Sequence, residues 1–345
     1  MKAAFLNKIG NFILTDIKKP KCGPNDILIK VKACAICQTD IKMINCGHRD
    51  LVLPRILGHE ISGIISDLGS NVKNFKVGEK VQIYPGISCG LCKYCINGYQ
   101  NMCNNISIIG FHHNGGFAEY LILPFKAINS GCINIIPDNL TFEEASLSEP
   151  IACCINALEA ADFKPGENII IWGSGFMGLL FIQLFKAYGA SKVIAVDKNN
   201  ERFAASKKFG ADHFVNSAYE DVFQEIEEFL IGDGADLIII ACSNIEEPNR
   251  IIKLLSKRGR IVFFSGIKES ENNIFIDHNL IHYKELKIVG SYGCTSRQNV
   301  LALHLLSTGK IKVKDLIAHC INIDQIEYGI KMALDSKGMK VIVNY

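Results

Sequence analysis

The sequence predicts a two-domain α/β protein that combines a β-rich domain with a doubly wound parallel sheet. Its 345 residues are enough for about two domains of roughly 150 residues each. The first third of the chain alternates short apolar runs with turn residues, a spacing typical of short strands. From about Glu143 onward, helical periods alternate with continuous apolar runs, which is the pattern of repeated βα units.

The composition narrows the class of protein. Hydrophobic residues make up 48% and charged residues 21% of the chain, which excludes a disordered or collagen-like protein. The net charge of +2 provides no broad basic field, so we expect a small molecule as partner rather than a nucleic acid or a membrane. No apolar stretch reaches the roughly 18 residues of a membrane span, and residues 1–8 lack the apolar core of a signal peptide. We therefore expect a cytoplasmic protein.

The β-rich part is expected to hold several short strands. They fall at residues 1–5, 12–15, 27–31, 61–65, 80–84 and 118–123. Glycines separate these runs, as in a small antiparallel barrel.

The second part is expected to fold as βα units, and the last part as mixed structure. Strands are expected at residues 168–172, 192–196, 237–241 and 260–264, with a helix at 177–188. Helical segments precede the later strands, so the strands should form a parallel sheet. The chain then ends with helices at residues 298–307 and 325–336 and a closing strand at 340–344.

A compact group of cysteines predicts a structural metal site. Among 14 cysteines, four lie in one short loop at Cys89, Cys92, Cys95 and Cys103. Four thiolates from one loop complete a tetrahedral zinc site with no open position, which makes the site structural rather than catalytic. The alternatives are an iron–sulfur cluster, whose common spacing differs, and unliganded thiols.

A glycine motif predicts a dinucleotide site. Residues 173–178 read Gly-Ser-Gly-Phe-Met-Gly, between an apolar strand and a helical pattern, and Asp197 ends the next strand. Gly173 would permit the turn, Gly175 the approach of the pyrophosphate, and Gly178 the close packing of helix and strand. The backbone N–H groups of Phe176 and Met177, at the start of the helix, would donate to the phosphates. Asp197 would bind the ribose hydroxyls and favour NAD over NADP, although Lys198 weakens this preference. The alternative is a glycine turn that binds no nucleotide.

A second set of ligand-type residues lies in the β-rich part. Cys37 heads a Cys-x-Thr-Asp motif, and His59 and Glu60 form a Gly-His-Glu motif with Gly58. A thiolate, an imidazole and a carboxylate are the mixed ligands of a catalytic zinc. Taken alone, the His-Glu pair is also compatible with a surface feature, and Cys37 with a buried thiol.

Together these motifs resemble the zinc-dependent medium-chain dehydrogenase/reductase family. The resemblance rests on the motifs at residues 37–40, 58–60, 89–103, 115–120, 149–150 and 173–178, in this order, and covers essentially the whole chain. The run Glu149-Pro150-Ile151-Ala152 resembles the polyol branch, with sorbitol, galactitol-phosphate and threonine dehydrogenases. The resemblance implies a GroES-like zinc-binding catalytic domain (1–148), a Rossmann NAD-binding domain (149–290) and a C-terminal segment (291–345) that completes the catalytic domain. It also suggests a homodimer or homotetramer.

The resemblance also assigns roles to single residues. The implied ligands of the catalytic zinc are Cys37, His59, Glu60 and Glu149, the last either directly or through water. Cys153, one helical turn beyond Glu149, is a rival ligand. Asp40 would orient the imidazole of His59, and Thr39 would receive the substrate proton.

Three further features concern the cofactor and the substrate. Arg202 matches the side chain that packs over adenine in the family. Lys42 stands where many relatives have a histidine that passes the proton to solvent, so the exit of the proton relay is open. With Lys42, the basic stretch from His48 to Arg55 could bind a phosphate or carboxylate of the substrate, or simply be a solvated loop. His112 and His113 could touch substrate hydroxyls or lie at the surface.

These observations predict an enzyme with two zinc ions per chain and NAD as cofactor. Its reaction would be the oxidation of a secondary alcohol to a ketone, the substrate being a polyol or sugar alcohol, with or without a phosphate group. The Glu-Pro motif equally permits the oxidation of threonine at its hydroxyl. An alternative from another class is a catalytically silent, NAD-binding redox sensor.

Overall fold

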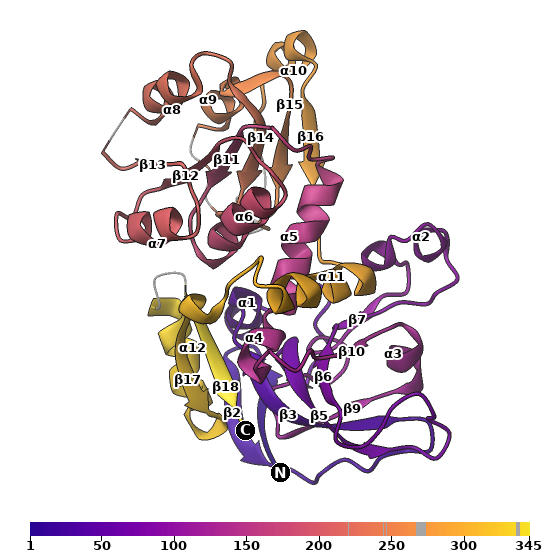
Figure 1. Cartoon of the computed structure of the whole chain (residues 1–345). Helices are drawn as coiled ribbons and strands as arrows, with labels where there is room; N and C mark the ends of the chain where they lie inside the picture. The colour runs from indigo at the N-terminus through magenta and orange to yellow at the C-terminus, as the bar shows by residue number, and fades with distance from the viewer. Residues whose placement is uncertain (220, 244, 246, 267–273, 336–338) are drawn as a thin grey trace. The chain divides into compact units, whose positions relative to one another are not determined.

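The computed structural model describes residues 1–219, 221–243, 245, 247–266, 274–335 and 339–345, and it divides the chain into two compact units (Figure 1). The first unit comprises Met1–Ala152 and Gly293–Tyr345, and the second comprises Cys153–Tyr292. The division after residue 152 lies inside a continuous helix, α5 (Ser148–Ala160), whose first residue we had expected to mark the boundary. The C-terminal segment therefore belongs to the same unit as the N-terminal part.

The first unit is built on mainly antiparallel sheets, with one parallel pair between the strands Ile317–Asn322 and Lys340–Asn344. Its seven-stranded sheet runs in the order β10-β6-β5-β3-β18-β17, with β9 also paired to β3, and a smaller sheet runs β2-β1-β4. The strands are β1 (Lys2–Lys8), β2 (Asn11–Asp16), β3 (Ile27–Ala35), β4 (Arg55–Ile56), β5 (Glu60–Leu68), β6 (Lys80–Ile83), β7 (Gly86–Ile87), β8 (Ser107–Ile108), β9 (Tyr120–Leu123), β10 (Ile133–Ile135), β17 (Ile317–Asn322) and β18 (Lys340–Asn344). All six strands expected in the first part of the chain are present.

Strand β3 is the centre of this unit. It pairs along one edge with β5, and along the other edge with β9 in its first half and with β18 in its second half. Its apolar residues are almost fully buried, because both faces of the strand are covered. The pairing of Ile342 with Ala35 brings the end of the chain against a strand from its beginning.

Short helices complete the first unit. They are α1 (Gln38–Cys46), α2 (Lys93–Ile96), α3 (Phe125–Asn129), α4 (Phe142–Ser146), α11 (Ser296–Ser307) and α12 (Ile326–Asp335), with 3-10 turns at Gln100–Met102, Lys314–Leu316 and Ile323–Gln325. Helix α11 begins two residues earlier than we expected, and the Thr295 hydroxyl caps it by accepting the N–H of Gln298. Ser336, the expected end of α12, lies outside the described residues.

The second unit contains a six-stranded parallel sheet in the order β13-β12-β11-β14-β15-β16. Its strands are β11 (Ile169–Trp172), β12 (Val193–Asp197), β13 (His213–Asn216), β14 (Ala235–Ile240), β15 (Leu255–Phe263) and β16 (Lys287–Gly290), and its further helices are α6 (Phe176–Ala187), α7 (Arg202–Lys208), α8 (Val222–Leu230), α9 (Pro248–Lys253) and α10 (His278–Lys284). Counted along the chain this order is 3-2-1-4-5-6, the Rossmann topology. The predicted doubly wound parallel sheet is confirmed.

Burial explains which of these strands were visible in the sequence. The central strands are continuous runs of fully buried Ile and Val, because helices cover both faces of a parallel sheet. The edge strands β13 and β16 are only four residues long and lack a continuous buried apolar run, because β13 begins with two half-buried residues and β16 carries half-buried and exposed ones, so we did not expect them. In the described part of the chain, no helix is long and apolar enough to cross a membrane.

Candidate functional site

The four-cysteine loop brings its sulfur atoms together. The Sγ atoms of Cys89, Cys92, Cys95 and Cys103 all lie within 4.8 Å of one another. The loop leaves β7 at its first cysteine, carries the third on α2 and returns through the turn Gln100–Met102 to the fourth. Gly90 and Gly98 take positive φ angles of 74° and 85° that let the chain reverse around the sulfurs.

Backbone amides favour thiolates in this loop. The N–H of Cys89 donates to Cys103 Sγ over 3.2 Å, and the N–H of Cys92 donates to Cys89 Sγ over 3.4 Å. Backbone N–H groups of Cys95 and Asn104 lower the pKa of Cys92 to about 6, whereas burial raises the pKa of Cys103 to about 11. Four sulfurs that converge under amide donors fit a closed tetrahedral zinc site.

The second ligand group also converges. The ligand atoms of Cys37, His59 and Glu60 lie within 4.8 Å of one another. Cys37 directly precedes α1, and the other two stand where the chain enters β5. Gly58 makes this entry possible: its φ is +90°, and a Cβ there would come within 2.8 Å of the Cys34 sulfur and of the Phe117 ring.

The Asp40 carboxylate contacts two of these ligand residues, Cys37 and His59. The carboxylate is fully buried and accepts the N–H of Cys37 over 2.9 Å and the N–H of Gly58 over 3.2 Å. One of its oxygens lies 3.3 Å from His59 Nδ1, so Nε2 is the ring nitrogen left for a metal. Burial lowers the pKa of His59, but the carboxylate of Asp40 and the Cys37 thiolate outweigh burial and hold that pKa well above its usual range.

Glu60 forms a buried ion pair that the sequence analysis missed. The ammonium group of Lys340, on β18, donates to Glu60 Oε1 and, over 3.4 Å, to the carbonyl of Ile36. Glu60 Oε2 is buried and has no hydrogen-bond partner among the described residues. An unpartnered buried carboxylate oxygen beside a thiolate and an imidazole fits a metal ligand. The available signal was a lysine opening an otherwise apolar strand, Lys340-Val341-Ile342-Val343.

Glu149 stands apart from this group. It lies in the first turn of α5, is largely buried, and places a carboxylate oxygen within 4.8 Å of Cys294 Sγ. In the described residues, no set of mutually close ligand atoms joins Glu149 to Cys37, His59 and Glu60. Cys153 follows Glu149 one turn later on the same helix. Cys294 was not among the expected site residues, because it belongs to no motif.

The residues expected to serve the proton relay lie on α1. Thr39 is half-buried at the start of this helix, and Lys42 is exposed one turn further on. The buried face of α1 is formed by Asp40, Ile41, Met43 and Ile44. The helix therefore anchors Asp40 in the core and leaves Lys42 in solvent.

The basic stretch between the ligand motifs does not converge on one point. Arg49 contacts its neighbour Asp50 at 3.3 Å, while Arg55 donates to the carbonyl of Val52 and to Asn114 Oδ1. Arg49 thus pairs with its neighbour in an exposed segment, whereas Arg55 is half-buried at the start of β4 and contacts a distant residue, and the two guanidinium groups share no partner in these contacts.

The histidines near this loop are held by local contacts. His48 and His59 both pack edge-on against Phe111, with ring centroids 5.3 and 5.5 Å away. His113 Nε2 lies 3.1 Å from the Ser107 hydroxyl, and His112 Nδ1 accepts the N–H of Ile108. His48 is half-buried and shares the Phe111 ring with His59, one of the expected zinc ligands.

The glycine motif forms the turn between β11 and α6 in the second unit. Gly173 has a φ of +102°, and a Cβ on Gly178 would lie 2.0 Å from the carbonyl oxygen of Gly173. A Cβ on Gly175 would meet only the Arg202 guanidinium, at 3.5 Å. Gly175 caps α6, so its open side adjoins the amides of Phe176 and Met177. This cradle fits the pyrophosphate of a dinucleotide.

Asp197 ends β12 beside this turn. Its buried carboxylate accepts the N–H of Ser174 over 2.7 Å and the N–H of Asn199 over 3.0 Å. Arg202 donates to the same carboxylate over 2.6 Å. The arginine that we expected over adenine is therefore ion-paired with Asp197, which offsets the negative charge that would repel a 2′-phosphate.

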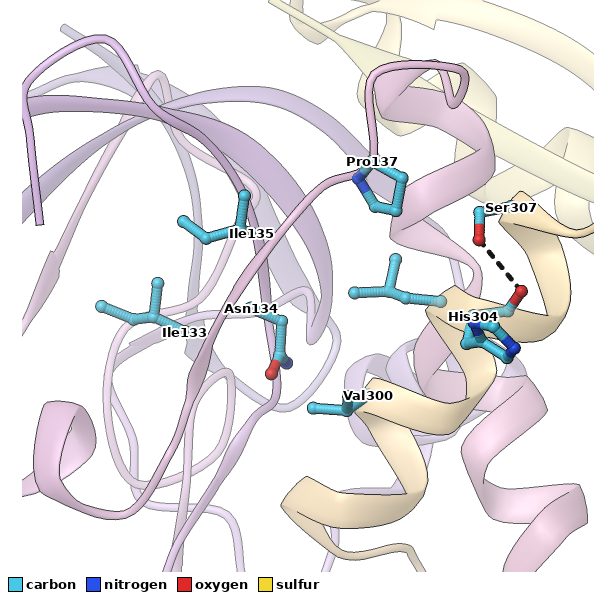
Figure 2. Close-up of a pocket in the computed structure, with 8 residues that line it drawn as sticks. Ile133, Asn134, Ile135, Pro137, Val300, His304 and Ser307 are labelled. Carbon is cyan, nitrogen blue, oxygen red and sulfur yellow. Dashed lines mark hydrogen bonds between the residues drawn. The ribbon is translucent and has the colours of Figure 1, made fainter.

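A separate pocket lies in the first unit, and none of the residues that line it belongs to either ligand group (Figure 2). Residues of β10 and α11 line it, among them Ile133, Asn134, Val300 and His304. Ser307 closes one end and donates its hydroxyl to the carbonyl of His304 over 3.0 Å. Its lining is mostly apolar and contains none of the residues that the sequence singled out.

Both units match families and relatives among known proteins. Residues 23–132 match the family described as alcohol dehydrogenase GroES-like domain, and residues 177–308 match the family described as zinc-binding dehydrogenase. The L-threonine 3-dehydrogenase of Chromobacterium violaceum is 30% identical over 336 residues, 96% of each chain. A protein of Aspergillus clavatus named as a probable D-xylulose reductase A is 33% identical, over 93% of this chain and 89% of its own.

A solved structure extends the likeness to three dimensions. A zinc-binding dehydrogenase of Sinorhizobium meliloti 1021, bound to NADP, superposes with a TM-score of 0.91 and 31% identity over 100% of this chain and 99% of its own. The predicted fold class, GroES-like with a Rossmann-type domain, is thereby confirmed.

Proposed function

The chain belongs to the zinc-dependent medium-chain dehydrogenase family, and from that membership we propose that it oxidises a secondary alcohol group of a polyol or sugar alcohol to a ketone. It is a zinc-containing alcohol dehydrogenase that uses NAD(P), so the silent redox sensor considered from the sequence is not retained. The observation that carries the proposal is the convergence of half-buried Cys37 with buried His59 and Glu60, together with the unpartnered carboxylate oxygen of Glu60 among the described residues.

The residues around this group have separate tasks in the proposed reaction. When bound, zinc supplies a Lewis acid that makes the alcohol more acidic, and NAD supplies the hydride acceptor. Cys37, His59 and Glu60 would hold the metal, with Glu149 as an exchangeable fourth ligand. Asp40 keeps the His59 imidazole in place through its 3.3 Å contact with Nδ1.

Thr39 would accept the proton of the substrate hydroxyl. It lies two residues after Cys37 and directly before the buried Asp40, so the first turn of α1 fixes its position. From Thr39 the proton would pass on to water. Lys42 is exposed one turn away on the same helix, and its ammonium group has no lone pair with which to accept the proton. The four-cysteine loop would hold a second, structural zinc.

NAD is the proposed cofactor, bound at the glycine turn of the second unit. Asp197 supports this choice because its carboxylate would accept hydrogen bonds from the ribose hydroxyls. Arg202 moderates the preference, since it neutralises part of that charge at 2.6 Å. A relative with 31% identity binds NADP, so we expect a measurable reaction with both cofactors and the higher kcat/KM with NAD.

Oxidation of threonine is the second candidate. The relative from Chromobacterium violaceum carries this activity in its name. An amino acid substrate needs a cationic group for its carboxylate, and Lys42, Arg49 and Arg55 lie between the two ligand motifs in the sequence. Arg49 and Arg55 already contact protein partners, which favours the uncharged polyol.

We also propose an assembly and a compartment for the protein. We propose a homodimer or homotetramer, which light scattering coupled to gel filtration would identify. Zinc-binding thiols require a reducing environment, which supports a cytoplasmic location.

An initial-rate panel tests the proposed reaction. NAD and NADP are each assayed with sugar alcohols, their phosphates, inositols, short diols and L-threonine. The polyol proposal expects the highest kcat/KM with an unphosphorylated polyol and NAD, and a dominant rate with threonine would contradict it. If a phosphorylated polyol is preferred, Lys42→Ala and Arg49→Ala should raise its KM while leaving the KM of the parent polyol unchanged.

A further inference from the structure

The ion pair between Lys340 and Glu60 is unusual for its place in the fold. The side chains of Lys340 and Glu60 are 7% and 0% exposed. Lys340 opens β18, whose next residues Val341, Ile342 and Val343 are fully buried. The pairing of β18 with β3 therefore delivers one cation from the end of the chain to a proposed zinc ligand 280 residues earlier.

Stability alone gives this pair little reason to exist. Removing two charges from water costs more than their attraction usually returns, and apolar residues of similar volume often stabilise a core as well or better. The neighbours of Lys340 on β18 are such residues. A lysine at this position is better explained by what it does to Glu60.

We propose that Lys340 is a positioning residue that holds Glu60 by one oxygen, presents the other oxygen to the catalytic zinc and offsets one negative charge of the ligand set. The proposal rests on the proposed function, because it takes Cys37, His59 and Glu60 as the metal ligands. The two carboxylate oxygens of Glu60 have different surroundings, as the proposal requires. Oε1 accepts a hydrogen bond from Lys340, and Oε2 is buried without a hydrogen-bond partner among the described residues.

The charge of Lys340 would also affect the acidity of an alcohol bound at the zinc. A Cys37 thiolate and a Glu60 carboxylate together cancel the two charges of a zinc ion, and the acidic side chains of Asp40 and Glu149 also lie in this buried region. Lys340 restores one positive charge. A more positive centre makes a bound alcohol more acidic, so the lysine would favour catalysis at the expense of metal affinity.

Lys340→Met tests this balance because it removes the charge and keeps most of the volume. Without the lysine, the metal-free protein holds an unpaired buried carboxylate, while the metal-loaded protein pairs that carboxylate with zinc. We therefore expect the variant to bind the catalytic zinc about tenfold more tightly or more. We also expect the acidic limb of its kcat profile to move upward by about one pH unit or more.

The experiment measures the metal separately from turnover. Zinc content per chain and competition with a chromophoric chelator give the stoichiometry and the affinity, and Co²⁺ substitution reports the ligand geometry through its absorption bands. Lys340→Arg should return both readouts toward the parent values. Lys331→Met, which removes an exposed lysine of α12, is the matched control and should leave both unchanged.

The possible results separate the two proposals. A parent protein with zinc only at the four-cysteine loop overturns the proposed catalytic site, and this inference with it. If the parent holds two zinc ions but Lys340→Met matches Lys331→Met in zinc affinity and pH profile, this inference alone is overturned. Weaker zinc binding by Lys340→Met than by the parent overturns it as well. Should Lys340→Met fail to fold, Lys340→Gln removes the same charge, keeps a hydrogen-bond donor and is read by the same criteria.

Discussion

Two glycines of the turn between β11 and α6 offer a test in which one methyl group has opposite effects at neighbouring positions. Gly175 has a φ of −68° and a ψ of −170°, which alanine adopts without strain, and its new Cβ would meet the protein only at 3.5 Å. At Gly178 the Cβ would lie 2.0 Å from a backbone oxygen, far inside van der Waals contact. Gly175→Ala should thus spare the fold, and Gly178→Ala should damage it.

The structure sets the size of each effect. For Gly178→Ala, the start of α6 must separate from the turn because the clash is with backbone at 2.0 Å, which places the cost near the upper end of about 1–3 kcal/mol for an overpacked core. Alanine within a helix returns about 1 kcal/mol, so the net loss of stability should be about 2 kcal/mol. Gly175→Ala should change the free energy of unfolding by less than about 0.5 kcal/mol. Its methyl group would occupy the cradle proposed for the pyrophosphate, so the Kd of NADH should rise at least tenfold, or about 1.4 kcal/mol.

One fluorophore can report both quantities. Trp172 is the single tryptophan of the chain and ends β11, directly before the turn. Urea unfolding followed by its emission gives the stability, and energy transfer from Trp172 to NADH gives the binding. If Gly175→Ala bound NADH as tightly as the parent, the pyrophosphate would not approach this glycine. If Gly178→Ala were as stable as the parent, the 2.0 Å contact would be relieved by a movement that costs nothing.

Four further predictions concern the thiols, the cofactor and the metals. After zinc removal at pH 7.5, iodoacetamide should label Cys92 first and Cys103 last among the four loop cysteines. Acidification below about pH 6 should slow the labelling of Cys92, because its pKa of about 6 makes it a thiolate only above that pH; mass spectrometry of the digest would reveal the opposite order if this is wrong. Asp197→Ser should narrow the ratio of kcat/KM for NAD over NADP, and an unchanged ratio would remove Asp197 from cofactor choice. A chelator should extract the zinc of the Cys37 group first and abolish activity while far-ultraviolet circular dichroism persists; activity that outlasts the first zinc would contradict the assignment. Asp40→Asn should lower zinc affinity or activity by about 10- to 100-fold, whereas parent-like values would make Asp40 dispensable for orienting the ligands.

The sequence alone predicted whatever depends on residues close together in the chain. The spacing of Cys89 to Cys103 already specified a closed thiolate site, since a loop that short cannot spread four sulfurs far apart. The central strands of the second unit were equally visible, because strands covered on both faces are continuous apolar runs. The glycine motif with Asp197 indicated a dinucleotide turn for the same local reason.

Contacts between distant segments were decided only by the tertiary structure. No sequence pattern indicates that β18 pairs with β3. The ion pair of Lys340 with Glu60 therefore could not be predicted, although the strand that begins at Lys340 and the motif that contains Glu60 were both predicted. Likewise, the sequence placed Asp197 and Arg202 five residues apart but could not tell whether the guanidinium turns toward adenine or toward the carboxylate. A motif states which groups are available, whereas their charge balance and orientation depend on side chains that packing brings together from hundreds of residues away.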